Sequence, residues 1–202
     1  MLKVGLTGSI AVGKSFLCNV FRELGCHVLD ADKTAREVVE PGTAGHRNII
    51  KQFGEGVLAA DGSIDRKRLG AIVFADEQKR ELLNSIVHPL VIESQDEWLR
   101  ECEADDPRGI AIVDAALMIE SGGYKRFDSL IVVWCEPAIQ LGRLMLRDGL
   151  TREEAAKRIA AQMPQDEKKR FADHLIDTSN GFDETREQTI AVFEKLRQPL
   201  PG

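Results

Sequence analysis

The octapeptide Gly8-Ser9-Ile10-Ala11-Val12-Gly13-Lys14-Ser15 decides the fold class of this chain. It matches G-x-x-x-x-G-K-[ST], the pattern of a phosphate-binding loop, or P-loop. Glycines let the backbone curl so that successive N–H groups point inward at phosphate oxygens. In this pattern Lys14 reaches the β- and γ-phosphates, and the Ser15 hydroxyl binds Mg²⁺. The octapeptide therefore predicts a site for nucleotide phosphates and Mg²⁺; if the chain is a kinase, the expected nucleotide is ATP.

The residues on either side of the P-loop supply the structural context that this motif requires. Apolar residues alternate over 2–6, as in a strand, and recur at helical spacing from Lys14 to Leu24. Gly25 then fits a C-terminal cap, and residues 26–30 are an apolar run typical of a buried strand. Strand, loop, helix and strand form a βαβ unit, which implies a parallel sheet with a right-handed crossover.

Strand patterns return only in the second half of the chain. Apolar runs predict strands at 110–114, 130–135 and 175–177. Helices are expected over 137–148, 151–163 and 183–197, the second opened by a capping box at Thr151–Glu154. We therefore predict an α/β fold of the P-loop NTPase type, with a parallel five-stranded sheet flanked by helices. Its nucleotide-binding core combines residues 1–32, 105–138 and 172–202.

Two segments lie outside this core. Residues 33–104 contain no convincing buried strand, so we predict a helical insertion that binds the acceptor. Residues 139–171 are expected to form a helical lid. The helices expected in the insertion cover 44–53, 66–74, 76–86 and 89–103, with Pro89 at a first helical position.

Composition narrows the class of protein. The chain has 202 residues and a net charge of -6, which argues against nucleic-acid and membrane-surface partners. No apolar run approaches the ~18 residues of a membrane span, and the N-terminus lacks the apolar core of a signal peptide. The isolated cysteines, which form no C-x-x-C pair, fit reduced structural cysteines of a cytoplasmic protein. They are Cys18, Cys26, Cys102 and Cys135.

A kinase and a nucleotide switch compete as functions for a P-loop chain. A GTP-binding switch normally carries N-K-x-D for the guanine base, and this tetrapeptide does not occur. Asp30 and Asp32 support a kinase, because they stand at the carboxyl end of the second strand, where open α/β sheets bind ligands. A carboxylate there could take the proton of an acceptor hydroxyl during phosphoryl transfer. The alternative is that these aspartates cap the next helix.

Arginines on the predicted lid supply positive charge for phosphates. Arg143 and Arg147 share one helix face at spacing i, i+4, and could clamp phosphates and exclude water. A solvated face is the alternative, which we favour for Arg152. We also interpret the basic run Lys168–Arg170 as a solvated helix face.

Over nearly its whole length the chain resembles the dephospho-coenzyme A kinase family. The P-loop is shared by many enzymes, but the run D-A-D-x-x-A-R-x-V-V-x-P-G over 30–42 and the pair His88-Pro89 are far more specific. The other segments that carry the resemblance are Gly5–Gly8, Asp65-Arg66, Leu69-Gly70, Val73-Phe74, Gln140-Leu141, Arg143, Arg147–Leu150, Arg158–Gln162, Ala172-Asp173 and Ile176–Gly181.

The resemblance implies transfer of the ATP γ-phosphoryl group to the ribose 3′-hydroxyl of dephospho-CoA, the last step of coenzyme A biosynthesis. By position, Asp32 would be the catalytic base, and Arg143 and Arg147 would act with Lys14 near the phosphates. The acceptor side would hold Arg66, His88 and Glu120, although His88 before Pro89 could instead be a helix cap. The ATP phosphates would be lined by Gly8, Ala11, Val12, Gly13, Lys14, Ser15 and Phe16.

Some positions depart from the family pattern. Ser9 and Val12 stand where the family has glycines or small residues, and Val12 must keep a negative φ because it is β-branched. Ala116 and Ile119 replace a proline and an aromatic residue, so altered packing around the acceptor is expected. A P-loop kinase of another small acceptor, such as a nucleoside or nucleoside monophosphate, remains the alternative. The sequence leaves open whether the protein is a monomer or a small homo-oligomer.

Overall fold

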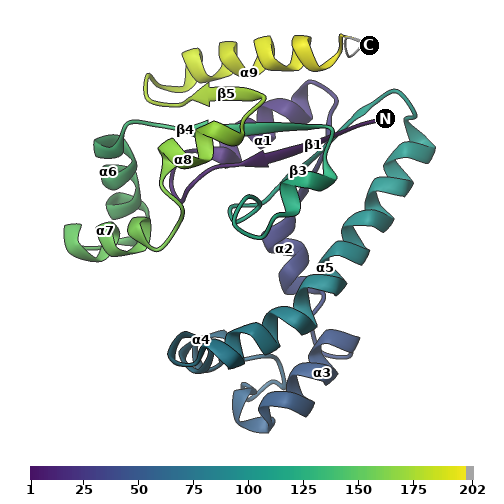
Figure 1. Cartoon of the computed structure of the whole chain (residues 1–202), viewed down its shortest axis with the longest axis vertical. Helices are drawn as coiled ribbons and strands as arrows, with labels where there is room; N and C mark the ends of the chain where they lie inside the picture. Colours follow the sequence, from purple (N-terminus) through teal and green to yellow (C-terminus); the bar gives the residue numbers. More distant parts are fainter. Residues whose placement is uncertain (199–202) are drawn as a thin grey trace. The chain divides into compact units, whose positions relative to one another are not determined.

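The structure, a computed structural model, describes residues 1–198 and divides into two compact units. One unit joins residues 1–30 to the chain from Cys102 onward, and the other comprises Ala31–Glu101. All strands belong to the first unit, and the second is built from helices and turns (Figure 1). No helix among residues 1–198 is long and apolar enough to cross a membrane.

Five parallel strands form the sheet of the first unit, as predicted. Their order across the sheet is β2-β3-β1-β4-β5, with β1 in the centre. Because β1 is central, the P-loop that follows it leaves the middle of the sheet at its carboxyl edge. The strands are β1 (Leu2–Thr7), β2 (His27–Asp30), β3 (Ile110–Asp114), β4 (Ser129–Trp134) and β5 (His174–Asp177).

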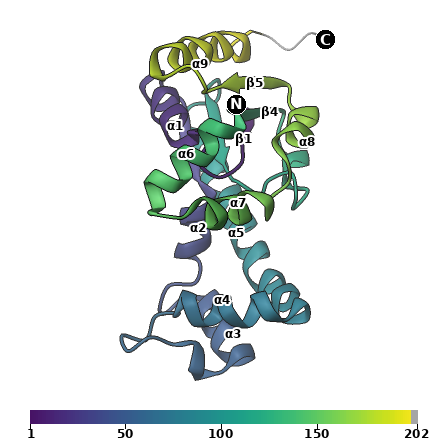
Figure 2. The ribbon, with the colours of Figure 1, turned by 90° about the vertical axis from the view of Figure 1, so that its left-hand side faces the viewer.

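Helices α1 and α9 pack side by side on one face of this sheet (Figure 2). Leu17 and Phe21 of α1 and Val192 of α9 join the strand side chains in the main apolar core. Of the other helical elements, η2 lies between β3 and β4, and α6, α7, α8 and η3 lie between β4 and β5. The helical elements of the unit are α1 (Lys14–Glu23), η2 (Gly123–Arg126), α6 (Pro137–Asp148), α7 (Arg152–Ala160), α8 (Gln165–Lys168), η3 (Lys169–Phe171) and α9 (Phe182–Leu196).

The segment after β3 covers the opposite side of β1. At Gly5 a Cβ atom would lie 2.6 Å from Sδ of Met118 and 3.1 Å from Phe127, both in that segment, and 2.9 Å from Leu130 of β4, so a larger residue would displace these side chains. The loop that follows Asp114 thus runs close over the sheet. This packing sets the position of that loop relative to the P-loop.

The second unit is helical, as predicted. It has a small apolar core of its own, centred on Ile49, Val57 and Leu69. Thr43 and Asp65 cap its helices by accepting hydrogen bonds from backbone N–H groups of the first turn. Its elements are α2 (Ala31–Glu37), α3 (Ala44–Phe53), η1 (Glu55–Val57), α4 (Arg66–Ala75) and most of α5 (Glu77–Asp105).

The prediction of two helices that meet at Pro89 is wrong, because α5 runs unbroken from Glu77 to Asp105 with Pro89 inside it. Proline removes one backbone hydrogen bond and costs roughly 3 kcal/mol in a helix interior. The turns on both sides of Pro89 still form their own hydrogen bonds, so the helix continues. His88 therefore lies within a helix and is not a cap.

Candidate active site

Backbone geometry gives the P-loop its shape. Gly13 has φ 94° and directly precedes the first residue of α1. Ala11 has φ 61°, and it is the one residue other than glycine with positive φ among residues 1–198. Val12 keeps a negative φ, as predicted, and its side chain is fully buried in the main core. Gly8 is required because a Cβ there would collide with the carbonyl oxygen of Val133.

The P-loop ends at the N-terminus of α1, where helix geometry leaves backbone N–H groups without partners inside the helix. These N–H groups and the helix dipole attract anions. Lys14 donates a hydrogen bond from Nζ to the Gly8 carbonyl oxygen over 3.2 Å, so its ammonium lies across the loop. Ser15 in the first turn is exposed. The arrangement is that of a phosphate site.

A cavity of about 450 Å³ opens beside the P-loop. It brings together most residues that the sequence predicted for ATP with the two predicted lid arginines. The remaining lining comes from α6, from the loop after β5 and from the first turn of α9. The lining residues are Ala11, Val12, Gly13, Lys14, Ser15, Phe16, Arg143, Leu146, Arg147, Thr178, Gly181, Phe182 and Thr185.

Arg143 is bound to the loop that follows β5. Its guanidinium donates to the Thr178 hydroxyl over 2.8 Å and to the Thr178 carbonyl over 2.7 Å. The buried Thr178 hydroxyl in turn donates to the carbonyl oxygen of Val12 over 2.7 Å. Arg143 thus lines the cavity and supports the P-loop through Thr178.

Arg147 lines the cavity from an exposed position on α6. Its guanidinium makes two hydrogen bonds to Asp148, of 2.7 and 3.2 Å, and Arg158 of α7 binds the same carboxylate at 2.9 Å. The bond to Asp148 raises the pKa of Arg147, and Arg147 first and Arg158 second lower the pKa of Asp148. This carboxylate joins α6 to α7 and leaves Arg147 charged.

Asp114 ends β3 and pairs in register with Leu6 of β1, next to the strand end that leads into the P-loop. The Cys18 thiol donates to its Oδ2 over 3.5 Å. Burial, and then the Asp114 charge, raise the pKa of Cys18 to about 12. Ser15 and Cys18 lie on one face of α1 at spacing i, i+3, so Asp114 is on the Ser15 side of the helix.

These oxygens fit Mg²⁺. A serine hydroxyl and one carboxylate beside a phosphate site are the protein ligands that Mg²⁺ takes with nucleotide phosphates. Within residues 1–198, no group of three or more His, Cys, Asp or Glu residues is arranged to hold a metal ion.

The prediction that Lys168 lies on a solvated face is wrong. Its ammonium is fully buried and donates to the Ala116 carbonyl at 2.7 Å and to the Glu120 carboxylate at 2.8 and 3.1 Å. Burial lowers the pKa of Lys168, and Glu120 opposes this shift. Glu120 also accepts a hydrogen bond from the Met163 N–H. In this structure Glu120 therefore binds Lys168, and a contact with the acceptor stays a prediction.

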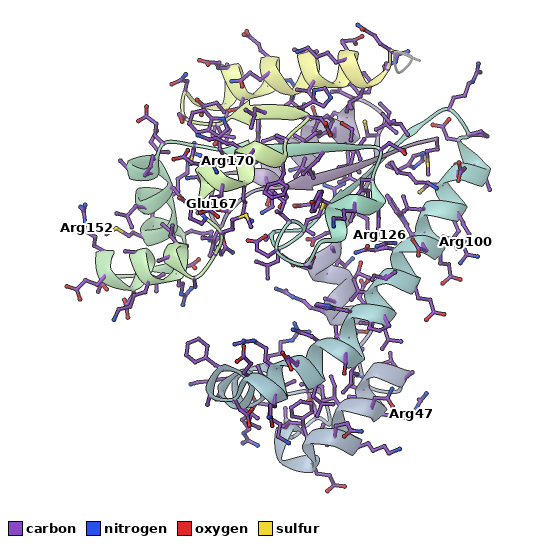
Figure 3. All side chains as sticks on the ribbon, viewed as in Figure 1. Arg47, Arg100, Arg126, Arg152, Glu167 and Arg170 are labelled. Carbon is purple, nitrogen blue, oxygen red and sulfur yellow. The ribbon has the colours of Figure 1, made fainter. Side chains whose placement is uncertain are left out.

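The other predicted site residues belong to the helical unit. Asp32 is exposed in the first turn of α2. Arg66 is exposed at the start of α4, and His88 is exposed within α5. Figure 3 shows every described side chain, including the surface arginines Arg47 and Arg100 of α3 and α5. Roles for Asp32, Arg66 and His88 stay predictions.

The sequence reasoning assigned no role to several cavity residues. Thr178 and Gly181 come from the loop after β5, Phe182 from the start of α9, and Leu146 from α6. The rule that ligands bind at the carboxyl ends of parallel strands could have indicated the loop after β5, because Thr178 directly follows that strand. Phe182 packs against Phe16 of α1, with ring centroids 4.9 Å apart, a contact that no local pattern predicts.

Comparison with known proteins agrees with this site. The dephospho-CoA kinase family profile matches residues 2–184. The dephospho-CoA kinase of Geobacter sulfurreducens is 46% identical over 196 residues, which is 97% of this chain and 98% of that protein.

Two solved structures share the fold over almost their whole length. The crystal structure of TT1252 from Thermus thermophilus has a TM-score of 0.84 and 29% identity, and covers 100% of this chain and 98% of that one. Dephospho-CoA kinase from Campylobacter jejuni has a TM-score of 0.72 and 28% identity, and covers 96% of each chain. With the P-loop cavity and its arginines, these matches place this chain in the dephospho-CoA kinase family of ATP-dependent kinases.

Proposed function

We propose that this chain transfers the γ-phosphoryl group of ATP to the ribose 3′-hydroxyl of dephospho-CoA, giving coenzyme A and ADP. The observation that carries the proposal is the cavity in which Lys14, Ser15, Arg143 and Arg147 meet at the N-terminus of α1. Three cations and a hydroxyl line one space of a size suited to a nucleotide.

The nucleotide half of the site is assigned from the lining of the cavity. Backbone N–H groups of the P-loop and Lys14 bind the phosphates. Leu146 and Phe182 are 89% and 71% exposed and border the same cavity, so they offer apolar surface to the adenine base. Ser15 and Asp114 would hold Mg²⁺, which neutralises charge on the transferring phosphates when it is bound.

The chemistry then needs charge stabilisation and a proton acceptor. Arg147 is charged, exposed and tied to Asp148, which limits the positions that its guanidinium can take. It stabilises charge that develops on the transferring group. Asp32, exposed in the first turn of α2, takes the proton of the acceptor hydroxyl.

The helical unit supplies the acceptor site in this proposal. Arg66 and His88 bind dephospho-CoA there, with Glu120 acting from the first unit. Residues 139–171 act as a lid that carries Arg143 and Arg147. We further propose that the protein works in the cytoplasm, as a monomer or a small homo-oligomer.

A coupled ADP-release assay with ATP and Mg²⁺ tests the acceptor, with dephospho-CoA, adenosine, AMP and CMP compared at equal concentration. We expect turnover with dephospho-CoA at least ~100-fold above that with the other three. Release of ADP without acceptor is the background control. Faster turnover with a nucleoside or a nucleoside monophosphate would keep the kinase mechanism and refute the proposed acceptor.

A further inference from the structure

Three glutamines gather at Ile10 of the P-loop and are linked through it and through each other by hydrogen bonds, and none of them lines the nucleotide cavity. Gln140 comes from α6, Gln165 from α8, and Gln162 from the turn between α7 and α8. Gln140 and Gln165 contact each other, with Nε2 of Gln165 donating to Oε1 of Gln140 over 2.9 Å. None of the three takes part in the mechanism proposed above.

The cluster holds both polar backbone atoms of Ile10. The Ile10 N–H donates to Oε1 of Gln162 over 2.7 Å, and the Ile10 carbonyl accepts from Nε2 of Gln140 over 2.8 Å. Two side chains from separate elements thus bind one P-loop residue. We name this pair of contacts the Ile10 clamp.

The direction of each hydrogen bond follows from the backbone. An N–H can only donate, so Gln162 must accept at Ile10, and a carbonyl can only accept, so Gln140 must donate. Gln165 is fixed in the same way, because Cys135 N–H donates to its Oε1 and its Nε2 donates to the Cys135 carbonyl. The amide orientations are therefore determined, and each glutamine has a defined polarity.

The clamp acts next to a strained residue. Ala11, which follows Ile10, has φ 61°, a conformation disfavoured for any residue with a Cβ. Loops keep such conformations when surrounding contacts hold them. The Ile10 clamp holds the residue before Ala11, and Thr178 holds the Val12 carbonyl after it. Contacts on both sides thus fix the part of the loop that lines the cavity.

We propose that Gln140 and Gln162 are positioning residues that hold the P-loop in its nucleotide-binding shape through Ile10. Both glutamines lie in the segment 139–171, which also carries Arg143 and Arg147. The clamp therefore makes ATP affinity depend on how closely this segment packs against the P-loop. The consequence for turnover rests on the proposed function, whereas the effect on ATP affinity does not.

The clamp can be tested by substitutions that keep or remove the donor or the acceptor required at each position. Glutamate at 162 still accepts from the Ile10 N–H, but glutamate at 140 cannot donate to the Ile10 carbonyl. Gln140→Glu and Gln162→Glu add the same charge at neighbouring positions, but only the first removes a donor that the loop needs. A difference between the two variants therefore reports the direction of the hydrogen bond and not the added charge. Methionine at either position keeps a similar volume and removes the hydrogen bond.

ATP binding is measured by calorimetric titration without an acceptor, on variants whose folding is checked by thermal melting. We expect Gln140→Glu, Gln140→Met and Gln162→Met to raise the ATP Kd about tenfold, with binding stoichiometry unchanged. Gln162→Glu should bind at least about threefold more tightly than Gln162→Met. The control Arg152→Ala, on the exposed start of α7 (Figure 3), should bind ATP as the natural chain does.

Other outcomes overturn the proposal. Wild-type affinity in both methionine variants would show that the clamp does not set the shape of the loop. Equal weakening by Gln162→Glu and Gln162→Met would show that the polarity of the bond is irrelevant. Lower stoichiometry at constant Kd would mark the glutamines as supports of folding only. If variants of the buried Gln140 do not fold, the two variants of the partly buried Gln162 still decide the question. Failure of dephospho-CoA as acceptor would leave these binding results unaffected.

Discussion

Removal of the Glu120 carboxylate tests how the buried Lys168 is stabilised. The Lys168 side chain is 1% exposed and that of Glu120 is 24% exposed, with Nζ and Oε1 separated by 2.8 Å. In Glu120→Ala the ammonium would keep the Ala116 carbonyl as its remaining acceptor in this set. Breaking a buried ion pair by removing one partner costs about 3–5 kcal/mol. We take the lower end, ~3 kcal/mol, because a buried lysine can lose its proton.

Removal of the other partner, Lys168, should lower the free energy of unfolding by less. Lys168→Met keeps the volume of the side chain and leaves a carboxylate that water reaches, so ~1–2 kcal/mol is expected. For a chain of this size, 1 kcal/mol shifts the melting temperature by roughly 2–4 °C. Glu120→Ala should therefore lower the melting temperature by about 6–12 °C and Lys168→Met by about 2–8 °C. The double variant should be more stable than Glu120→Ala alone.

The pH dependence gives a second check. Burial lowers the pKa of Lys168 in the folded protein, so between this pKa and the ordinary lysine value of about 10.4 the unfolded chain binds more protons. Loss of Glu120 removes the group that opposes this shift, so the pKa of Lys168 lies lower still in Glu120→Ala. Stability of Glu120→Ala relative to the natural chain should therefore rise with pH between the pKa of Lys168 in the variant and that in the natural chain, because only the variant loses the buried charge there.

Thermal melts at about pH 7 and pH 9 measure these effects, with Arg170→Met, at an exposed neighbouring cation (Figure 3), as control. Melting temperatures of Glu120→Ala and the natural chain within about 2 °C at pH 7 would refute the reasoning. A larger loss in Lys168→Met than in Glu120→Ala would do so too.

Other substitutions test the proposed mechanism. Asp32→Asn should lower turnover ~10²–10⁴-fold without changing the melting temperature; full activity would exclude Asp32 as the base. Arg147→Ala should lower kcat more than ATP affinity, and an unaltered rate would leave Arg147 a surface charge. Thr178→Val should weaken ATP binding in titration, because the Val12 carbonyl loses its donor. Since burial raises the pKa of Cys18 and Cys26 to about 12, mass spectrometry should find neither alkylated in the folded protein at about pH 8.5; rapid labelling would contradict this.

The sequence by itself determined the features that depend on short stretches of chain. The P-loop, the helix after it and the capping box at Thr151 are local, because glycine freedom, helical spacing and first-turn hydrogen bonds act over a few residues. The parallel sheet followed from the βαβ pattern, and all five strands lie where apolar runs predicted them.

Local rules misjudged Pro89 and Lys168. The usual place of proline at a helix start predicted a boundary, but intact turns on both sides carry α5 through Pro89. The basic run at 168–170 looked solvated, yet Lys168 is buried because Glu120, 48 residues earlier in the chain, lies against it. A local charge pattern predicts neither the burial of Lys168 nor its ion pair with Glu120.

Tertiary structure alone decided the strand order and two sets of hydrogen bonds. One set joins Arg143 to Thr178 and Thr178 to Val12, and the other is the Ile10 clamp. Gln140 and Ile10 are 130 residues apart in sequence, and Thr178 and Val12 are 166 apart. Such contacts arise because packing of the sheet and its helices brings distant segments to one edge. The sequence therefore identified the groups that bind phosphate, whereas the fold selected the side chains that hold those groups in place.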